Sequence, residues 1–248
     1  MLRALLDVLL PPTCLACSEP IRAGDDARLV CRLCRTRLRR LPWPQCERCG
    51  APLLRTGLEG ASQCLECVGW PVAIRAARSA VLLAPPADTI VHQLKYRGWR
   101  ALAGPVAECM ASIVLPRDAD EEAHLCVPVP TTAERLRTRG YNQAACIAEG
   151  YARLTGRTVE ALLERGRARD TQTHLQPAAR AANVAGAFRV RPGADALLHG
   201  AHVLLIDDVL TTGATIAECA TTLVAAGARC VTAVTFARAL DARRLTGT

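Results

Sequence analysis

The segment at residues 203–215 constrains the fold more than any other stretch of this 248-residue chain. It begins with the apolar run VLLI, which is typical of a strand that is buried on both faces in a parallel sheet. Asp207 and Asp208 follow at the predicted carboxyl end of this strand, and small and hydroxylated residues then open a helix. Ligands of open α/β sheets bind at this end of the strands. The segment therefore predicts an α/β fold with a binding site after the strand.

The turn that follows the two acids consists of Thr211, Thr212, Gly213, Ala214 and Thr215. A turn at a helix start offers backbone N–H groups, hydroxyls and the positive end of the helix dipole to a phosphate monoester. Carboxylates instead accept hydrogen bonds from vicinal hydroxyls, or hold Mg²⁺ through water. A ribose 5-phosphate satisfies both halves, with its hydroxyls on the acids and its phosphate in the turn.

The ten residues IDDVLTTGAT at 206–215 resemble the phosphoribosyl-pyrophosphate (PRPP) motif of type I phosphoribosyltransferases. The resemblance implies that the two acids and the 211–215 turn bind PRPP together with Mg²⁺. The alternative interpretation is an ordinary strand, acidic turn and helix start without a ligand.

Four C-x2-C pairs between residues 14 and 67 predict two structural zinc sites. Each pair offers two sulfurs to one tetrahedral ion, and gaps of 13 and 14 residues let two pairs meet across a short loop. The two halves resemble an internal repeat, which favours sequential pairing, although an interleaved arrangement is the alternative. Redox-active thiols are the alternative, but a redox-active pair seldom occurs four times in one chain. The predicted ligands are Cys14, Cys17, Cys31 and Cys34 in one site and Cys46, Cys49, Cys64 and Cys67 in the other.

These cysteines define the expected organisation of the chain. Only Trp43 and Trp70 are aromatic in the first 70 residues, so this part has little apolar core and should depend on metal. We expect a double zinc-ribbon domain at 1–70 and a phosphoribosyltransferase-like domain at 71–248. Metal-spaced thiols favour the reducing cytoplasm. Residues 1–10 predict a short amphipathic helix, with a signal peptide or a membrane-surface segment as alternatives, and no apolar run is long enough to span a membrane.

Several cations follow predicted strand ends or helix ends, where they could contact pyrophosphate. One of them is the only lysine of the chain, and another falls in the polar stretch 165–183, which we interpret as a mobile lid over the phosphates. Solvated surface charges are the alternative interpretation. These candidates are Lys95, Arg135, Arg139 and Arg169.

The remaining periodicity predicts the elements around the site. The expected strands are 79–84, 125–130 and 230–235, and residues 188–191 return the chain towards the strand at 203. The expected helices are 87–96, 102–115, one running from about 139 to 154, and one from 215 to the region of Gly227.

Basic residues are unevenly distributed. The formal charge is +8, and residues 131–191 hold eleven arginines against five acids. The run RTRLRR at 35–40 also lies between the two halves of the cysteine-rich part. Both features fit phosphate-rich ligands or nucleic acid, and both also fit a solvated helix face.

Further motifs connect the whole chain to one family. Together with the cysteine pairs and IDDVLTTGAT, they resemble the ComF family of bacterial proteins, whose members include ComFC and GntX. The additional motifs are LKYRG at 94–98, VPVP at 127–130, RGYNQ at 139–143 and the pattern TQT…L…R…N at 171–183.

The family resemblance implies a type I phosphoribosyltransferase fold, with a mostly parallel sheet flanked by helices after an N-terminal double zinc ribbon. It also implies PRPP binding and, for the competence members, a cytoplasmic role in handling single-stranded DNA with other DNA-uptake proteins. It supplies no acceptor base. Three hypotheses therefore stay open at this point: an accessory factor of DNA uptake, an active phosphoribosyltransferase with a nitrogenous acceptor, and a regulatory PRPP site whose ribbons bind a protein.

Overall fold

The computed structural model describes residues 12–21, 29–53, 64–166 and 186–240. A five-stranded sheet forms its centre, with the strand order β1-β7-β6-β2-β3 and parallel pairing throughout. A second sheet pairs two short antiparallel strands. The strands are β1 Ile74–Leu82, β2 Leu125–Pro128, β3 Thr158–Val159, β4 Leu163–Arg165, β5 Phe188–Val190, β6 His202–Leu210 and β7 Cys230–Arg238.

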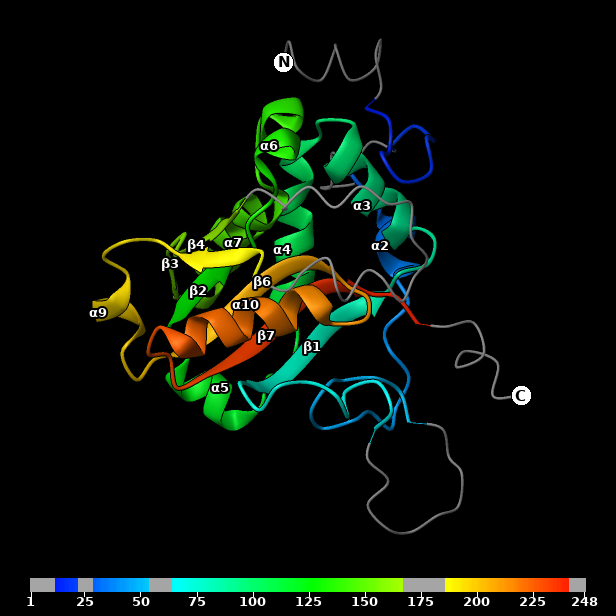
Figure 1. The fold of residues 1–248 in the computed structure, drawn as a ribbon. Coiled ribbons are helices and arrows are strands. Elements are labelled where there is room, and N and C mark those ends of the chain that lie inside the picture. Colours follow the sequence, from blue (N-terminus) through cyan, green and yellow to red (C-terminus); the bar gives the residue numbers. More distant parts are fainter. Residues whose placement is uncertain (1–11, 22–28, 54–63, 167–185, 241–248) are drawn as a thin grey trace, which may run out of the picture.

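Helices cover both faces of the large sheet (Figure 1). One face carries α3, α4 and α7, and the other carries α10 together with the small β4–β5 sheet. The described helices are α2 Arg32–Thr36, α3 Ala87–Tyr96, η1 Arg100–Leu102, α4 Ala103–Ala111, α5 Arg117–Glu122, α6 Ala133–Arg139, α7 Gln143–Thr155, α9 Asp195–Leu198 and α10 Ala214–Ala225. This arrangement confirms the predicted α/β class with a parallel sheet.

Strand β6 is the middle strand of the sheet, and it is buried on both faces, as its apolar run predicted. Leu204 and Ile206 pack into the core on the side of α3, α4 and α7, while Val203 and Leu205 pack into the core beneath α10. All four side chains are fully buried. Alternate side chains of a strand point to opposite faces, so β6 holds the two halves of the core together.

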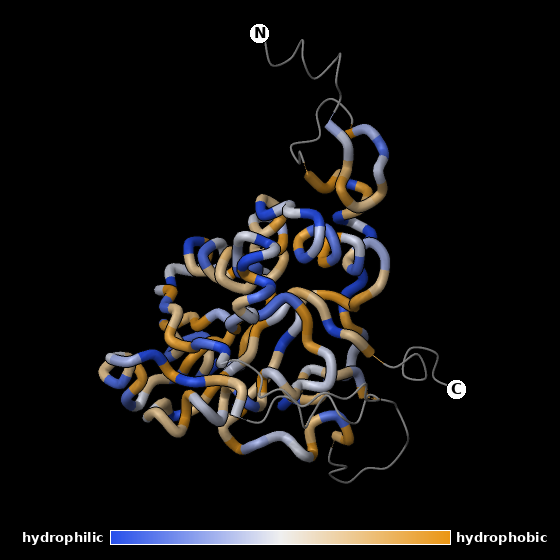
Figure 2. Tube along the Cα trace, turned by 45° about the horizontal axis from the view of Figure 1, so that its top comes forward, coloured by the Kyte–Doolittle hydropathy of each residue, from blue (hydrophilic) through white to orange (hydrophobic). Residues whose placement is uncertain are grey.

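The cysteine-rich part lies against this body in two places. Residues of the first ribbon form a small lobe at one end of the described chain (Figure 2). Cys14 and Cys34 belong to the same core as Ile90 of α3 and Val106 of α4. Cys49 and Cys67 form a separate cluster with Trp70, close to strand β1.

Several element boundaries differ from the sequence predictions. Strand β1 begins at Ile74 rather than 79, and β6 extends through both acids to Leu210, because β7 continues to pair with it as far as Arg238. The expected helix at 102–115 begins with a 3-10 turn and its α-helical part ends at Ala111.

The helix expected from about 139 to 154 is in fact preceded by a separate helix, α6, that carries the arginines. Gly140 ends α6 in the left-handed conformation at φ 81°, and the Asn142 side chain then caps the start of α7. The predicted N-terminal helix and almost all of the predicted lid lie outside the described residues. None of the helices in the described ranges has the length and apolar character that a membrane span requires.

Candidate functional site

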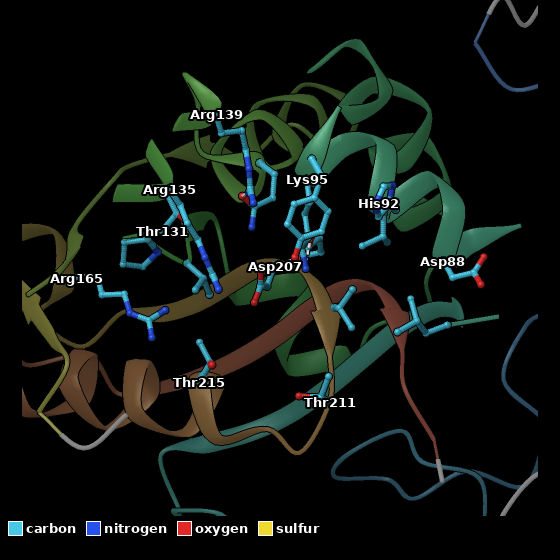
Figure 3. A pocket seen from close by; sticks show the side chains of 18 residues that line it. Asp88, His92, Lys95, Thr131, Arg135, Arg139, Arg165, Asp207, Thr211 and Thr215 are labelled. Carbon is cyan, nitrogen blue, oxygen red and sulfur yellow. Dashed lines mark hydrogen bonds and ion pairs between the residues drawn. The ribbon is translucent and has the colours of Figure 1, made fainter. Parts of the chain in front are cut away.

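A cavity of about 440 Å³ opens at the carboxyl end of β6, between α3, α6 and the start of α10 (Figure 3). The sequence predicted a site at this end of the sheet. Both acidic and basic side chains line the cavity. Most of the site residues that the sequence predicted are among them, although they come from elements far apart in the chain. Its charged and hydroxylated lining residues are Asp88, His92, Lys95, Tyr96, Thr131, Arg135, Arg139, Arg165, Asp207, Asp208, Thr211 and Thr215.

The two acids have different surroundings. The Asp208 carboxylate is buried and forms an ion pair with Lys95, whose Nζ lies 2.8 Å from Asp208 Oδ2. Asp207 lies beside it, and its Oδ1 accepts a hydrogen bond from the Asp208 backbone N–H at 2.8 Å. Burial, together with the Asp208 carboxylate, raises the pKa of Asp207 well above its usual value, and Lys95 acts in the opposite direction. Asp208 is thus charge-paired, while Asp207 holds its proton more tightly.

Helix α6 places two of the predicted arginines in the cavity. Arg135 and Arg139 are four residues apart, so they lie on the same face of this helix. Thr132 caps the helix start by accepting a hydrogen bond from the Arg135 backbone N–H at 3.2 Å. The Arg139 guanidinium donates to Gln143 Oε1 and lies over the Tyr96 ring, 5.7 Å from its centroid. These contacts orient Arg139 across the cavity mouth.

A further arginine was missed as an individual candidate. Arg165 ends β4 and lines the cavity opposite α3, with its guanidinium 5.2 Å from the centroid of the Phe188 ring (Figure 3). Burial and the charge of Arg135 lower the pKa of Arg165. The sequence placed this residue at the edge of a loop, because two strands of three residues each give almost no periodic signal. Thr131 was also missed, although it directly follows the VPVP motif.

The turn after β6 contributes Thr211 and Thr215 to the cavity, with Thr212, Gly213 and Ala214 between them. Gly213 adopts φ 85°, a left-handed conformation that favours glycine, and α10 begins at the next residue. Thr212 Oγ1 accepts a hydrogen bond from the Ala214 backbone N–H at 3.4 Å. The first turn of α10 contains no acidic residue, so its positive end is not neutralised locally. The remaining candidate, Arg169, lies outside the described residues.

The cysteines form two four-sulfur clusters with the sequential pairing that the repeat favoured. Within each cluster all Sγ atoms lie within 4.8 Å of one another. The Sγ–Sγ distances are 3.9 Å for Cys17–Cys31, 3.8 Å for Cys46–Cys67 and 3.6 Å for Cys49–Cys64. A tetrahedral zinc ion with Zn–S bonds of about 2.3 Å separates its sulfurs by about 3.8 Å. Both clusters therefore fit zinc.

The clusters predict two zinc ions per chain. We expect the substitutions Cys31→Ser and Cys64→Ser each to lower the zinc content to one ion, because each removes a ligand from a different cluster. Metal analysis of the purified protein measures this directly. As a control, Cys109→Ser alters a partly buried thiol outside both clusters and should retain two ions. A single substitution that removed both ions would contradict two independent sites.

The cysteine-rich part matches a known family model, the double zinc ribbon domain, over residues 5–68. Curated relatives are similar over most of the chain. DNA utilization protein YhgH of Salmonella typhimurium is 29% identical over 225 residues, which cover 89% of this chain and 94% of the relative. The YhgH protein of Escherichia coli K12 gives the same values, and that of Shigella flexneri is 28% identical.

Two solved enzyme structures align with part of the chain. The allosteric regulatory enzyme of purine biosynthesis aligns with a TM-score of 0.35 and 24% identity over 58% of this chain. Glutamine PRPP amidotransferase from B. subtilis aligns with a TM-score of 0.37 and 21% identity over 54%. The chain spans only 26% of the length of each enzyme.

The predicted architecture is confirmed at the level of its parts. Two four-cysteine clusters precede a parallel five-stranded sheet flanked by helices. The chain thus combines a cysteine-rich part that matches the double zinc ribbon domain with a parallel α/β domain, and it is similar over most of its length to the bacterial proteins named YhgH.

Proposed function

We propose that the protein binds PRPP with Mg²⁺ in the cavity at the end of β6 and acts in the cytoplasm as an accessory factor of DNA uptake or utilization, in contact with single-stranded DNA. The observation that carries this proposal is the convergence of three chemistries in one cavity: paired carboxylates, a helix-start turn and a group of cations. In this proposal the ribbons occupy residues 1–70 and the PRPP-binding domain residues 71–248.

The carboxylates suit the ribose and the metal. Asp207 and Asp208 present acceptor oxygens to the hydroxyls of a ribose, and Mg²⁺, when bound, supplies positive charge to the pyrophosphate oxygens. Lys95 already compensates the charge of Asp208 in the cavity. Asp208 is therefore compensated without a ligand, and both acids still line the cavity.

The turn and the cations suit the two phosphate ends. The 211–215 turn directs backbone N–H groups and the positive end of the twelve-residue helix α10 towards a monophosphate. Arg135, Arg139 and Arg165 face this turn across the cavity (Figure 3). Guanidinium groups bind phosphate oxygens in pairs, which favours pyrophosphate on that side.

The DNA-related part of the proposal draws on the relatives and on surface charge. The similar YhgH proteins are described as DNA utilization proteins, and this chain carries a formal charge of +8. Arg35, Arg37, Arg39 and Arg40 of the basic run are exposed at and after α2. Trp43 lies close by in sequence and is 81% exposed, so one aromatic ring is available for stacking beside these arginines. Other DNA-uptake proteins are the partners that this role implies.

A phosphoribosyltransferase activity is the second candidate. The cavity is partly apolar, because Val91, Tyr96, Val129 and Val209 line it next to the acids. The sequence had offered little evidence of such a surface. A flat nitrogenous acceptor could pack there, with the cations stabilising the departing pyrophosphate.

PRPP binding should depend on pH through Asp207. Because the pKa of this carboxyl is raised, acidification protonates it at a pH above the ordinary aspartate value of about 3.9, and an acceptor for the ribose hydroxyls and Mg²⁺ loses its charge. We expect calorimetry with PRPP and Mg²⁺ to show affinity falling as pH falls through this range. The variant Asp207→Asn should bind more weakly and show only the titration of the ligand itself. Equal pH profiles of the two proteins would contradict this role.

Single-stranded DNA binding should be mainly electrostatic. We expect the affinity for a labelled oligonucleotide to decrease steeply with salt, by about 0.7 units of log affinity per log unit of salt for each phosphate neutralised. Arg37→Glu should weaken binding and reduce this slope. Arg117→Glu changes another exposed arginine, on α5, away from α2 in Figure 1, and should have little effect. No binding to the zinc-loaded protein at low salt would refute the DNA contact.

Catalysis is tested by pyrophosphate release from PRPP and Mg²⁺ in the presence of a panel of nucleobases. If the protein is a phosphoribosyltransferase, one acceptor should stimulate release, and Asp208→Asn should reduce it about a hundredfold, because the carboxylate beside the reacting ribose is lost. Asp88→Asn, at the cavity edge, is the matched control and should retain most activity. If the protein binds PRPP but releases no pyrophosphate with any acceptor, the result would contradict the transferase activity and favour the accessory role.

A further inference from the structure

We propose that the second four-cysteine cluster, made of Cys46, Cys49, Cys64 and Cys67, holds the 211–215 turn in its binding conformation, with Trp70 as the positioning residue between them. The inference rests on the proposed function, because the turn is the part of the cavity assigned to the monophosphate of PRPP. According to this proposal, the second zinc site is needed for binding of the monophosphate as well as for folding.

Trp70 contacts the turn directly. Its indole Nε1–H donates a hydrogen bond to the backbone carbonyl of Thr212 at 3.3 Å. Its six-membered ring lies against the next residue so closely that a Cβ atom on Gly213 would come within 2.4 Å of it. Gly213 therefore has two reasons to be glycine: the left-handed backbone and the ring of Trp70. Because the ring and the turn are in such close contact, the turn cannot move without displacing the ring of Trp70.

The same tryptophan is attached to the zinc cluster. Trp70 packs against the buried residues Cys49, Ala51 and Cys67, and its backbone N–H donates to the carbonyl of Cys67 at 3.1 Å. Arg48, between the two cysteines of the CERC pair, donates from Nη1 to the Cys67 carbonyl at 3.1 Å and from Nη2 to the Trp70 carbonyl at 3.1 Å. The backbone around Trp70 is therefore fixed from two sides by residues of the cluster.

A second connection runs through the end of the sheet. Arg238 is the last residue of β7 and is paired with Leu210, the residue before the turn. Its side chain is 1% exposed, donates to the Cys49 carbonyl, and approaches Cys49 Sγ at 3.8 Å and Glu66 at 3.7 Å. A buried guanidinium requires nearby negative charge, which four thiolates around one zinc ion provide as a net charge of about −2. Arg238 thereby fits the metal-loaded cluster.

The first cluster is placed differently. Its buried residues Cys14 and Cys34 pack with Ile90 and Val106 on the other side of the molecule from α10. The two clusters have the same ligand chemistry, but only the second contacts Trp70 among the described residues. Variants of the first cluster are therefore matched controls for loss of the second.

The direct test compares Trp70→Phe with Trp43→Phe, since Trp43 is an exposed tryptophan of the same part of the chain. Calorimetry on the zinc-loaded full chain uses two probes, ribose 5-phosphate and pyrophosphate. Loss of the indole N–H should lower the affinity for ribose 5-phosphate about fivefold, which is the effect of one hydrogen bond. The affinity for pyrophosphate should stay unchanged. Trp43→Phe should change neither. Equal weakening of both probes in Trp70→Phe would indicate a general structural effect and overturn the proposal.

The role of the metal is tested by hydrogen exchange, which needs no ligand. In Cys64→Ser the backbone amides of residues 211–215 should exchange faster, while in Cys31→Ser they should exchange as in the native protein. Unchanged exchange in Cys64→Ser would overturn the coupling. If exchange responds as expected but the native protein binds neither probe, the coupling stands and the proposed PRPP site fails, so the two proposals are tested separately.

Discussion

The structure depends on the arrangement of charge at the end of one buried strand. Strand β6 is covered on both faces, so the carboxylate of Asp208 is taken out of water where the strand ends. A buried carboxylate is costly without a partner, and Lys95 provides one from α3 at 2.8 Å. Asp207 responds differently, with a pKa raised by burial and by its neighbour. The same strand that forms the middle of the core therefore ends in two acids whose negative charge needs nearby cations.

The cations that complete this site come from short elements. Helix α6 supplies Arg135 and Arg139, and the small β4–β5 sheet supplies Arg165. Helix α6 contributes little to the core, since none of its residues is buried, whereas Leu163 and Phe188 of the small sheet belong to the core beneath α10. Local contacts hold the arginines in place: Thr132 caps the start of α6, and aromatic rings lie under the guanidinium groups of Arg139 and Arg165. The large sheet positions the acids, and α6 and the small β4–β5 sheet position the arginines that would face a phosphate.

The cysteine clusters replace a hydrophobic core in the first part of the chain. Where few large apolar residues are available, four sulfur ligands can hold short loops together. The second cluster also uses its charge and its carbonyls to bind Arg48, Arg238 and Trp70. These residues connect the cluster to β1, to β7 and to the turn after β6, and this turn forms one wall of the cavity.

The sequence alone determined the elements with strong local signals. The run before Asp207 predicted a doubly buried strand, and the TTGAT letters predicted a helix start. Cysteine spacing predicted two metal clusters, and the internal repeat favoured sequential pairing over an interleaved one. Each signal is contained in a few neighbouring residues, and each is set by backbone geometry or ligand chemistry. The limits of β1 and β6 were less predictable, because strand length depends on how far the neighbouring strand continues to pair.

Only the tertiary structure decided which distant residues meet. It paired Lys95 with Asp208, brought Arg165 into the cavity, and placed Trp70 against Gly213, 143 positions further along the chain. None of these contacts follows from spacing, because each joins side chains whose separation in sequence has no fixed relation to their separation in space. The sequence determined the chemistry of the acids, the turn and the sulfurs, and the packing of the chain decided that Trp70 connects the second cysteine cluster to the turn.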